Sequence, residues 1–216
     1  MTVRLQHNQV ELALHQLRGG DGRPLLLLHA LGGQSPKAVP TWALPWSGPV
    51  WALDFTGHGD SSVPAGGGYT AEILMGDADI ALNHLGVSTV VGHGLGAYVA
   101  LLIAGARPSL VHGAVLVDGT GLAGGGVGPT SSVVIGPAPG SRLGSSPDPY
   151  ALVEMSRDVR PPDYATAFVR QAVQLAPTDT PIVVCTRWRP PWLEAVVNEP
   201  GVLECPTLVD ALTLFA

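Results

Sequence analysis

Residues 87–106 read VSTVVGHGLGAYVALLIAGA and join a predicted strand to a predicted helix. The β-branched run at 87–91 is typical of a buried parallel strand, and small apolar residues at helical spacing fill 97–106. Between them, Gly92–Gly96 has the spacing G-x-S-x-G, a strained strand-to-helix turn that exposes a nucleophilic serine. Gly94 replaces that serine, and it avoids the roughly 1–3 kcal/mol that a φ above zero costs other residues. The pattern therefore predicts the turn without its nucleophile.

Short apolar strands alternate with amphipathic helices along the rest of the chain. Thr70, with Glu72 close behind, is a typical helix N-cap ahead of apolar residues that recur with helical period up to Leu85. Strands are also predicted at 10–17, 24–29, 50–54, 113–118 and 181–185, and helices at 150–159, 164–175 and 206–215. This alternation predicts a single α/β domain over 1–216, with a mostly parallel central sheet and helices on both faces.

Composition limits the classes of partner. The 216 residues carry a formal net charge of −6, which argues against nucleic acid and anionic membranes, since both attract clustered Lys and Arg. No apolar run approaches the roughly 20 residues of a transmembrane span, and no leader pattern is visible, so a cytoplasmic protein is expected. Cys185 and Cys205 have no close spacing and are expected to be buried thiols. The single lysine, Lys37, against ten arginines suggests a GC-rich, bacterial genome.

Four motifs lie at or near the ends of predicted elements. They read HALGG at 29–33, DFTGHGDS at 54–61, GHGLG at 92–96 and ECP at 204–206. Together they resemble the α/β-hydrolase superfamily, in particular its small esterase, lipase and haloperoxidase-like members. The resemblance implies an α/β-hydrolase fold in which 119–180 forms a short, Gly-rich and degenerate lid or insert. Within it, the Gly-, Pro- and Ser-rich stretch 119–148 is expected to be mobile.

The same resemblance implies where the other members of a Ser-His-Asp triad would stand. Counting from Pro181 puts the acid at Pro190, and counting back from Pro206 puts the histidine at Glu199. The last histidine of the sequence is His112, and only about ten residues remain for the helix between acid and histidine. Serine hydrolysis loses orders of magnitude in rate when one triad member is removed. Gly94, Pro190 and Glu199 are therefore degenerate triad positions, and ordinary serine hydrolysis is not expected.

Other elements of such a site do not depend on triad side chains. The resemblance implies an oxyanion hole made by the main-chain N–H groups of Leu31 and Leu95, which could still hold a carbonyl or carboxylate. Alternatively, these groups close turns or bind water. His29 and His93 follow predicted strands and are candidate pocket-lining or acid/base residues, as is Asp54. All three are equally compatible with turn-shaping roles, and no complete metal-ligand set is visible, so neither metal nor cofactor is expected.

A basic and aromatic triplet follows the strand predicted at 181–185. Arg187 and Arg189 flank Trp188, and in an acidic protein they could recognise a carboxylate or phosphate, with the indole as a stacking surface. A solvated loop is the alternative.

Three hypotheses of function follow. The first is a catalytically silent α/β-hydrolase homologue that binds a small apolar, acyl or carboxylate ligand, or a protein partner, through the former active-site pocket. The second is an esterase-like or lyase-like enzyme that uses His93, His29 or Asp54 in place of a triad. The third is a scaffold subunit whose stretch 119–148 becomes ordered on a partner.

Overall fold

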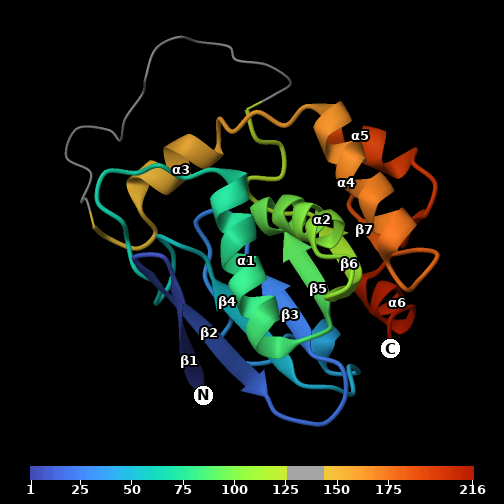
Figure 1. The fold of residues 1–216 in the computed structure, drawn as a ribbon, viewed down its shortest axis with the longest axis horizontal. Coiled ribbons are helices and arrows are strands. Elements are labelled where there is room, and N and C mark those ends of the chain that lie inside the picture. Colours follow the sequence, from blue (N-terminus) through green and yellow to red (C-terminus); the bar gives the residue numbers. More distant parts are fainter. Residues whose placement is uncertain (126–143) are drawn as a thin grey trace.

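A computed structural model describes residues 1–125 and 144–216. Its centre is an eight-stranded sheet with the order β1-β2-β4-β3-β5-β6-β7-β8 (Figure 1). The strands are β1 Thr2–His7, β2 Val10–Arg18, β3 Leu25–Leu28, β4 Val50–Asp54, β5 Ser88–His93, β6 Val111–Val117, β7 Ile182–Cys185 and β8 Val202–Glu204. Only β2 runs antiparallel to its neighbours, β1 and β4, and the other pairs are parallel. The predicted mostly parallel sheet is therefore confirmed.

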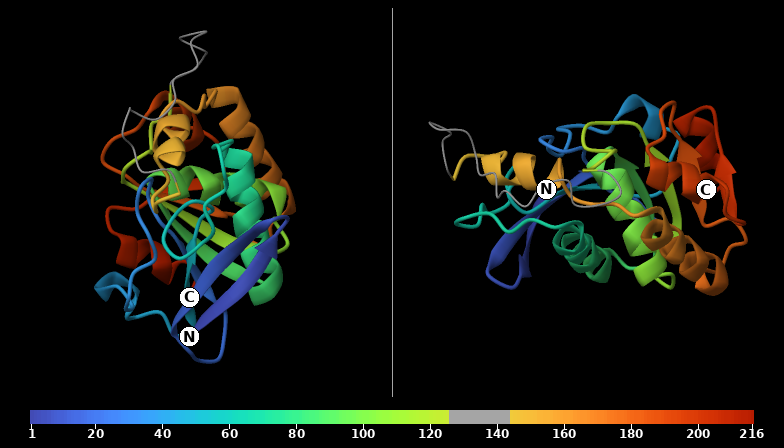
Figure 2. Two further views of the ribbon diagram at one scale, coloured as in Figure 1. Left: turned by 90° about the vertical axis from the view of Figure 1, so that its left-hand side faces the viewer. Right: turned by 90° about the horizontal axis from the view of Figure 1, so that it is seen from above.

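Helices cover both faces of the sheet, as predicted. The left-hand view of Figure 2 shows η1 and α6 on one side and α1 and α4 on the other. The helices are η1 Thr41–Ala43, α1 Ala71–Leu85, α2 Leu95–Ala106, α3 Pro149–Met155, α4 Pro162–Leu175, α5 Pro191–Val197 and α6 Leu208–Thr213. Two apolar layers result, a larger one under α1, α2, α4 and α5 and a smaller one under η1 and α6.

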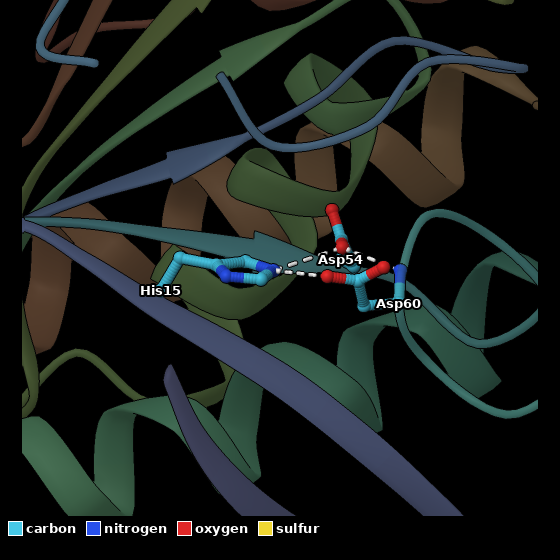
Figure 3. Close-up of side chains that lie close together, drawn as sticks. All are labelled: His15, Asp54 and Asp60. Carbon is cyan, nitrogen blue, oxygen red and sulfur yellow. Dashed lines mark hydrogen bonds and ion pairs between the residues drawn. The ribbon is translucent and has the colours of Figure 1, made fainter. Parts of the chain in front are cut away.

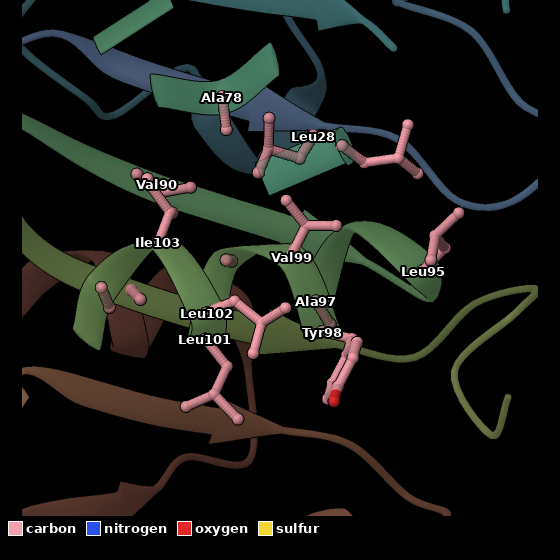
Figure 4. Packing of buried hydrophobic residues seen from close by; sticks show 14 of the residues in the cluster. Leu28, Ala78, Val90, Leu95, Ala97, Tyr98, Val99, Leu101, Leu102 and Ile103 are labelled. Carbon is pink, nitrogen blue, oxygen red and sulfur yellow. The ribbon is translucent and has the colours of Figure 1, made fainter. Parts of the chain in front are cut away.

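Helix α2 forms the centre of the larger layer. Every residue from Leu95 to Gly105 is buried, and Figure 4 shows side chains of α2 directed toward the sheet as well as toward neighbouring elements. Gly105 permits close packing against α4, because a Cβ there would lie 2.7 Å from the Cα of Phe168. The all-apolar sequence of α2 thus reflects burial on all sides, and it fixes the turn that precedes the helix.

Local signals placed several elements accurately, and four elements were missed. The Thr70 hydroxyl accepts a hydrogen bond from Ile73 N (3.3 Å), which confirms the predicted cap of α1. Strands β1 and β8 and helices η1 and α5 were not predicted. β1 is an edge strand with alternating exposure, and β8 and α5 span only three and seven residues. Of the stretch 119–148 that was expected to be mobile, 126–143 lies outside the described residues.

Candidate functional site

The turn between β5 and α2 has the predicted strained geometry. Gly94 adopts φ 56° and ψ −115°, a conformation that residues with a side chain rarely adopt. Its N–H donates to the carbonyl of Val117 on β6 (2.9 Å), which ties the turn to the neighbouring strand. Position 94 is therefore built as the central residue of a nucleophile-bearing turn, although it carries no side chain.

The two predicted oxyanion-hole donors converge on a carbonyl oxygen of the chain itself. Leu31 N and Leu95 N both donate to Thr120 O, at 3.1 and 3.0 Å. A ligand oxygen could reach these N–H groups only after Thr120 had moved. The ligand-binding role of Leu31 and Leu95 thus stays a prediction, and in this structure both groups bind the main chain.

The segment Gly119–Gly121, called here the plug segment, also fills the space above Gly94. An ideal Cβ at residue 94 would overlap Thr120 O and lie 2.6 Å from the carbonyl carbon of Gly119. Gly121 adopts φ 80°, and a Cβ there would lie 2.7 Å from the Leu31 Cβ. The plug segment therefore needs glycine both within itself and at position 94.

A buried arginine holds the chain that follows Thr120. Arg160 is 1% exposed, and its Nη1 donates to the carbonyls of Gly121 (2.6 Å) and Leu122 (2.7 Å). Its guanidinium lies 4.4 Å from the ring centroid of Tyr98 on α2 and pairs with Asp158 at 3.4 Å. Burial lowers the pKa of Arg160 and raises that of Asp158, whereas the pairing opposes both shifts. This arrangement anchors the plug segment to the core.

An apolar hollow of about 270 Å³, called here the elbow hollow, lies beside this turn. The ring centroids of Trp42 and His93 lie 5.8 Å apart, and the two ring planes are tilted by 46°. Burial lowers the pKa of His93, although a hydrogen bond with the main chain of Asp118 opposes that shift. The hollow therefore offers an apolar wall in which the His93 imidazole is kept neutral by burial. Its lining includes His29, Ala30, Pro36, Pro40, Trp42 and His93.

His29 lines the same hollow, but hydrogen bonds already occupy both of its ring nitrogens. Nε2 accepts from Phe55 N (3.1 Å), so Nδ1 carries the proton and donates to Ala30 O (2.8 Å). Burial, followed by the neighbouring His58, lowers the pKa of His29 to about 4. The ring is a neutral support of the turn, which disfavours the acid/base role considered for it.

Asp54 lies apart from the elbow hollow and contacts different partners. Its carboxylate accepts from Ser35 N (2.6 Å), from Asp60 N (2.8 Å) and contacts His15 Nε2 (3.0 Å). Burial alone would raise the pKa of Asp54, but the main-chain donors outweigh it and hold the pKa below its usual value. The structure thus separates Asp54 from His93, and the two do not form an acid/base pair.

Glu199, the position counted for the triad histidine, precedes β8 and pairs with Arg170 of α4. Glu204 is the last residue of β8. Active-site residues of parallel sheets follow the carboxyl ends of strands, and the residue directly after β8 is Cys205. Pro190 is the N-cap of α5, so the helix expected to be nearly lost is present in short form.

The three side chains of the basic triplet at 187–189 lie in different surroundings. Trp188 is 57% exposed. Arg189 already binds two carboxylates, those of Glu204 and Glu194. Arg187 is exposed, and its main-chain N–H donates to Asp118 Oδ2 at 2.7 Å. None of the three lines the elbow hollow. Recognition of an anion by Arg187 remains a prediction, whereas Arg189 would have to exchange a partner.

Thr120 and Arg160 were missed by sequence reasoning. A threonine between two glycines gives no sign that its carbonyl will meet two N–H groups from other loops. Arg160 stands in a Pro-rich turn that looks solvated in the sequence. Their roles depend on contacts between segments distant in the chain.

Comparison with known proteins agrees with the fold and the turns. Residues 23–148 match the family described as alpha/beta hydrolase fold. A protein called Esterase Rv0045c from Mycobacterium tuberculosis is 33% identical over 110 residues, which are 50% of this chain and 37% of that relative. The chain therefore spans little more than a third of the length of this curated relative.

Two solved structures give the extent of the structural likeness. A membrane phospholipase A covers 94% of this chain and 77% of its own, with a TM-score of 0.53 and 18% identity. E-2-(Acetamidomethylene)succinate hydrolase covers 56% of this chain and 45% of its own, with a TM-score of 0.46 and 26% identity. Among the described residues, no helix has the length and apolar character to cross a bilayer. On the family match over more than half of its length, the chain belongs to the α/β-hydrolase fold family.

Proposed function

We propose that this protein is a catalytically silent α/β-hydrolase homologue that binds a small apolar or acyl ligand in the elbow hollow. The observation that carries this proposal is the position of Thr120 O, which accepts from both Leu31 N and Leu95 N. Those donors stabilise the oxyanion of acyl transfer when they are free. Here they stabilise the plug segment instead.

The chemistry of position 94 supports the same proposal. A serine hydrolase needs a hydroxyl at the turn, a base within hydrogen-bonding distance and an acid that orients the base. Gly94 supplies no hydroxyl, and the plug segment leaves no room for a side chain at that position. Removal of the nucleophile and closure of the oxyanion hole both act against acyl transfer.

The dimensions and lining of the elbow hollow indicate the ligand class. About 270 Å³ is below the roughly 300 Å³ at which pockets for drug-sized ligands begin, so an acyl chain of medium length or a single ring fits best. Trp42 and the two prolines supply apolar surface, and the His93 imidazole supplies one polar contact. A medium-chain fatty acid or its methyl ester matches this combination.

Titration with octanoate and methyl octanoate, followed by calorimetry, tests the proposal. Trp42→Ala removes one wall of the elbow hollow and should weaken binding at least tenfold. Trp188→Ala is the matched control, because it removes an exposed indole outside the hollow and should leave the affinity unchanged. Equal affinities of both variants and the parent, or no binding at millimolar ligand, would refute the proposed pocket.

The alternative is an esterase-like enzyme with a different acid/base group. The name of the mycobacterial relative favours it, as does the place of His93 in the elbow hollow. A fluorophosphonate probe and a p-nitrophenyl butyrate assay separate the two proposals. The silent homologue should take up no probe and give only the background rate, whereas hydrolysis that is lost in His93→Gln would establish the enzyme.

A further inference from the structure

A second hollow, beside β2, is lined by three side chains with metal-binding atoms, His15, Asp54 and Asp60. Figure 3 shows these side chains close together. His15 Nε2 lies 3.0 Å from Asp54 Oδ2 and 4.0 Å from Asp60 Oδ2, and one oxygen or nitrogen of each residue lies within 4.8 Å of the others. The adjoining space measures about 440 Å³ and is predominantly polar. The cluster is separate from the turn at Gly94.

The fold brings these residues together through strand register. His15 of β2 pairs with Ala52 of β4, so Asp54, two residues further along β4, is its diagonal neighbour on the same face. Asp60 follows in the turn after β4, where its N–H donates to Asp54 Oδ2 at 2.8 Å. The juxtaposition is thus set by the sheet and by a hydrogen-bonded turn.

We propose that His15, Asp54 and Asp60 bind a divalent first-row transition-metal ion, such as Zn²⁺ or Mn²⁺. Such ions take imidazole nitrogen and carboxylate oxygen at about 2.0–2.2 Å, which places neighbouring ligand atoms about 3.0–3.5 Å apart. The contact from His15 to Asp54 already has this spacing, and the contact to Asp60 must shorten by less than an ångström. The Asp60 side chain is 69% exposed and can make that movement.

The surrounding contacts orient the ligands as metal sites require. His15 Nδ1 lies 2.9 Å from Thr2 Oγ1, so a proton on Nδ1 can be donated to the hydroxyl and leave a lone pair on Nε2. Asp54 Oδ1 accepts from Ser35 N at 2.6 Å, which fixes the carboxylate in place. Two carboxylates and a neutral imidazole carry a charge of −2, which a divalent ion balances.

Ser35 supplies an independent sign of a ligand. It lines this hollow and is 9% exposed, yet its Oγ makes no hydrogen bond of normal geometry, although it lies beside the Asp54 carboxylate. A buried hydroxyl normally has a partner, and a metal-bound water would provide one. Lys37 lines the same hollow, and no ion pair joins it to Asp54 or Asp60 among the described residues. Imidazole among the ligands favours a transition metal over Mg²⁺.

Calorimetric titration of tag-free, chelator-treated protein with ZnCl2, MnCl2 and MgCl2 tests the site. We expect one equivalent of Zn²⁺ or Mn²⁺ to bind at micromolar concentration and raise the Tm, and Mg²⁺ to bind at least tenfold more weakly. Asp60→Asn and His15→Gln should each weaken Zn²⁺ binding at least tenfold. Asp21→Asn, an exposed aspartate in the turn after β2, is the matched control and should bind as the parent does.

Other outcomes would overturn the proposal. Unchanged Zn²⁺ affinity in both site variants would place the ion elsewhere, and loss of binding on alkylation of Cys185 and Cys205 would identify the thiols as its ligands. No binding at millimolar metal would exclude the site. Circular dichroism of Asp60→Asn verifies folding, which the exposed position of Asp60 should preserve. The proposal is independent of the function proposed for the elbow hollow.

Discussion

The carbonyl oxygen of Thr120 lies where a side chain on Gly94 would have to stand. A Cβ at residue 94 would overlap this oxygen, and it would lie 2.6 Å from the carbonyl carbon of Gly119. Glycine at position 94 and the plug segment above the turn therefore depend on each other, because a side chain at residue 94 would displace Gly119 and Thr120. While glycine stands at position 94, Thr120 O of the plug segment can accept hydrogen bonds from Leu31 N and Leu95 N.

Gly94→Ser should destabilise the protein without restoring esterase activity. The φ of 56° costs a residue with a side chain roughly 1–3 kcal/mol, and overlap with the plug segment adds to that cost. Urea unfolding of the two proteins measures the difference, and an ester assay measures activity. We expect a lower free energy of unfolding and a background hydrolysis rate.

Gly66→Ser is the matched control for this substitution. Gly66 adopts φ 87°, and a Cβ there would meet nothing within 4 Å. Gly66→Ser therefore measures only the free energy that a positive φ costs a residue with a side chain. Gly94→Ser should lose more stability than Gly66→Ser, because it also overlaps the plug segment. Equal losses would show that the plug segment moves aside at little cost, and enzyme-like hydrolysis by Gly94→Ser would contradict the silent function.

Arg160→Met should loosen the plug segment. The substitution removes hydrogen bonds to the carbonyls of Gly121 and Leu122 and leaves the Asp158 carboxylate without its cation. Breaking a buried pair from one side costs about 3–5 kcal/mol. Hydrogen exchange should also become faster at the amides of Leu31 and Leu95, because Thr120 O would no longer be held against them.

Arg107→Met is the control for a lost ion pair. Arg107 binds Asp79 through two hydrogen bonds, but its side chain is 50% exposed, and exposed pairs contribute little. Arg107→Met should lose clearly less stability than Arg160→Met, and hydrogen exchange at the amides of Leu31 and Leu95 should not change. If both variants behaved alike, Arg160 would have no special role in anchoring the plug segment.

Sequence patterns predicted those parts of the fold that depend on local signals. The β-branched run, the glycine turn and the apolar helix around Gly94 are continuous in sequence, and the structure confirms them. Thr70 caps α1 through a hydrogen bond to Ile73 N, three residues away. Edge strand β1 and the short β8 carry too few apolar residues to be recognised alone.

The candidate site was less predictable because its contacts join distant segments. Thr120 O accepts from Leu31 N in the loop after β3 and from Leu95 N at the start of α2, and His15 meets Asp54 through strand register. Neither relationship has a pattern in the sequence. The position expected for a base, Glu199, came from a count back from Pro206, and the sequence did not reveal the short strand β8 that lies between these two residues.

Tyr69→Phe should weaken the attachment of α3. The Tyr69 hydroxyl donates to Asp148 Oδ2 at 2.7 Å, and Asp148 is 1% exposed and caps α3 through Tyr150 N. Loss of one donor to a buried carboxylate costs about 1–3 kcal/mol. Tyr164→Phe removes a hydroxyl at the surface, 38% exposed, and should change stability by less than about 0.5 kcal/mol. Similar losses in both variants would contradict the role assigned to Asp148.

Buried His29 should make the stability of the protein fall toward acid pH. Its pKa is lowered to about 4 in the folded protein, mainly by burial, whereas an unfolded histidine titrates near 6.5. Between these values the unfolded state binds a proton that the folded state does not. Its contribution to the free energy of unfolding is therefore complete above pH 6.5 and is lost as the pH falls toward 4, by up to about 1.4 kcal/mol per pH unit.

His29→Gln isolates this contribution. The glutamine amide can donate to Ala30 O and accept from Phe55 N, as the imidazole does, but it does not titrate. Urea unfolding at pH 7.5 measures any structural cost of the substitution, because an unfolded histidine is neutral there. When the pH is lowered to 4.5, the parent should lose more free energy of unfolding than the variant does. The carboxylates titrate alike in both proteins, so the difference between the two losses reports His29. Parallel pH profiles would show that His29 binds its proton equally in the folded and unfolded states.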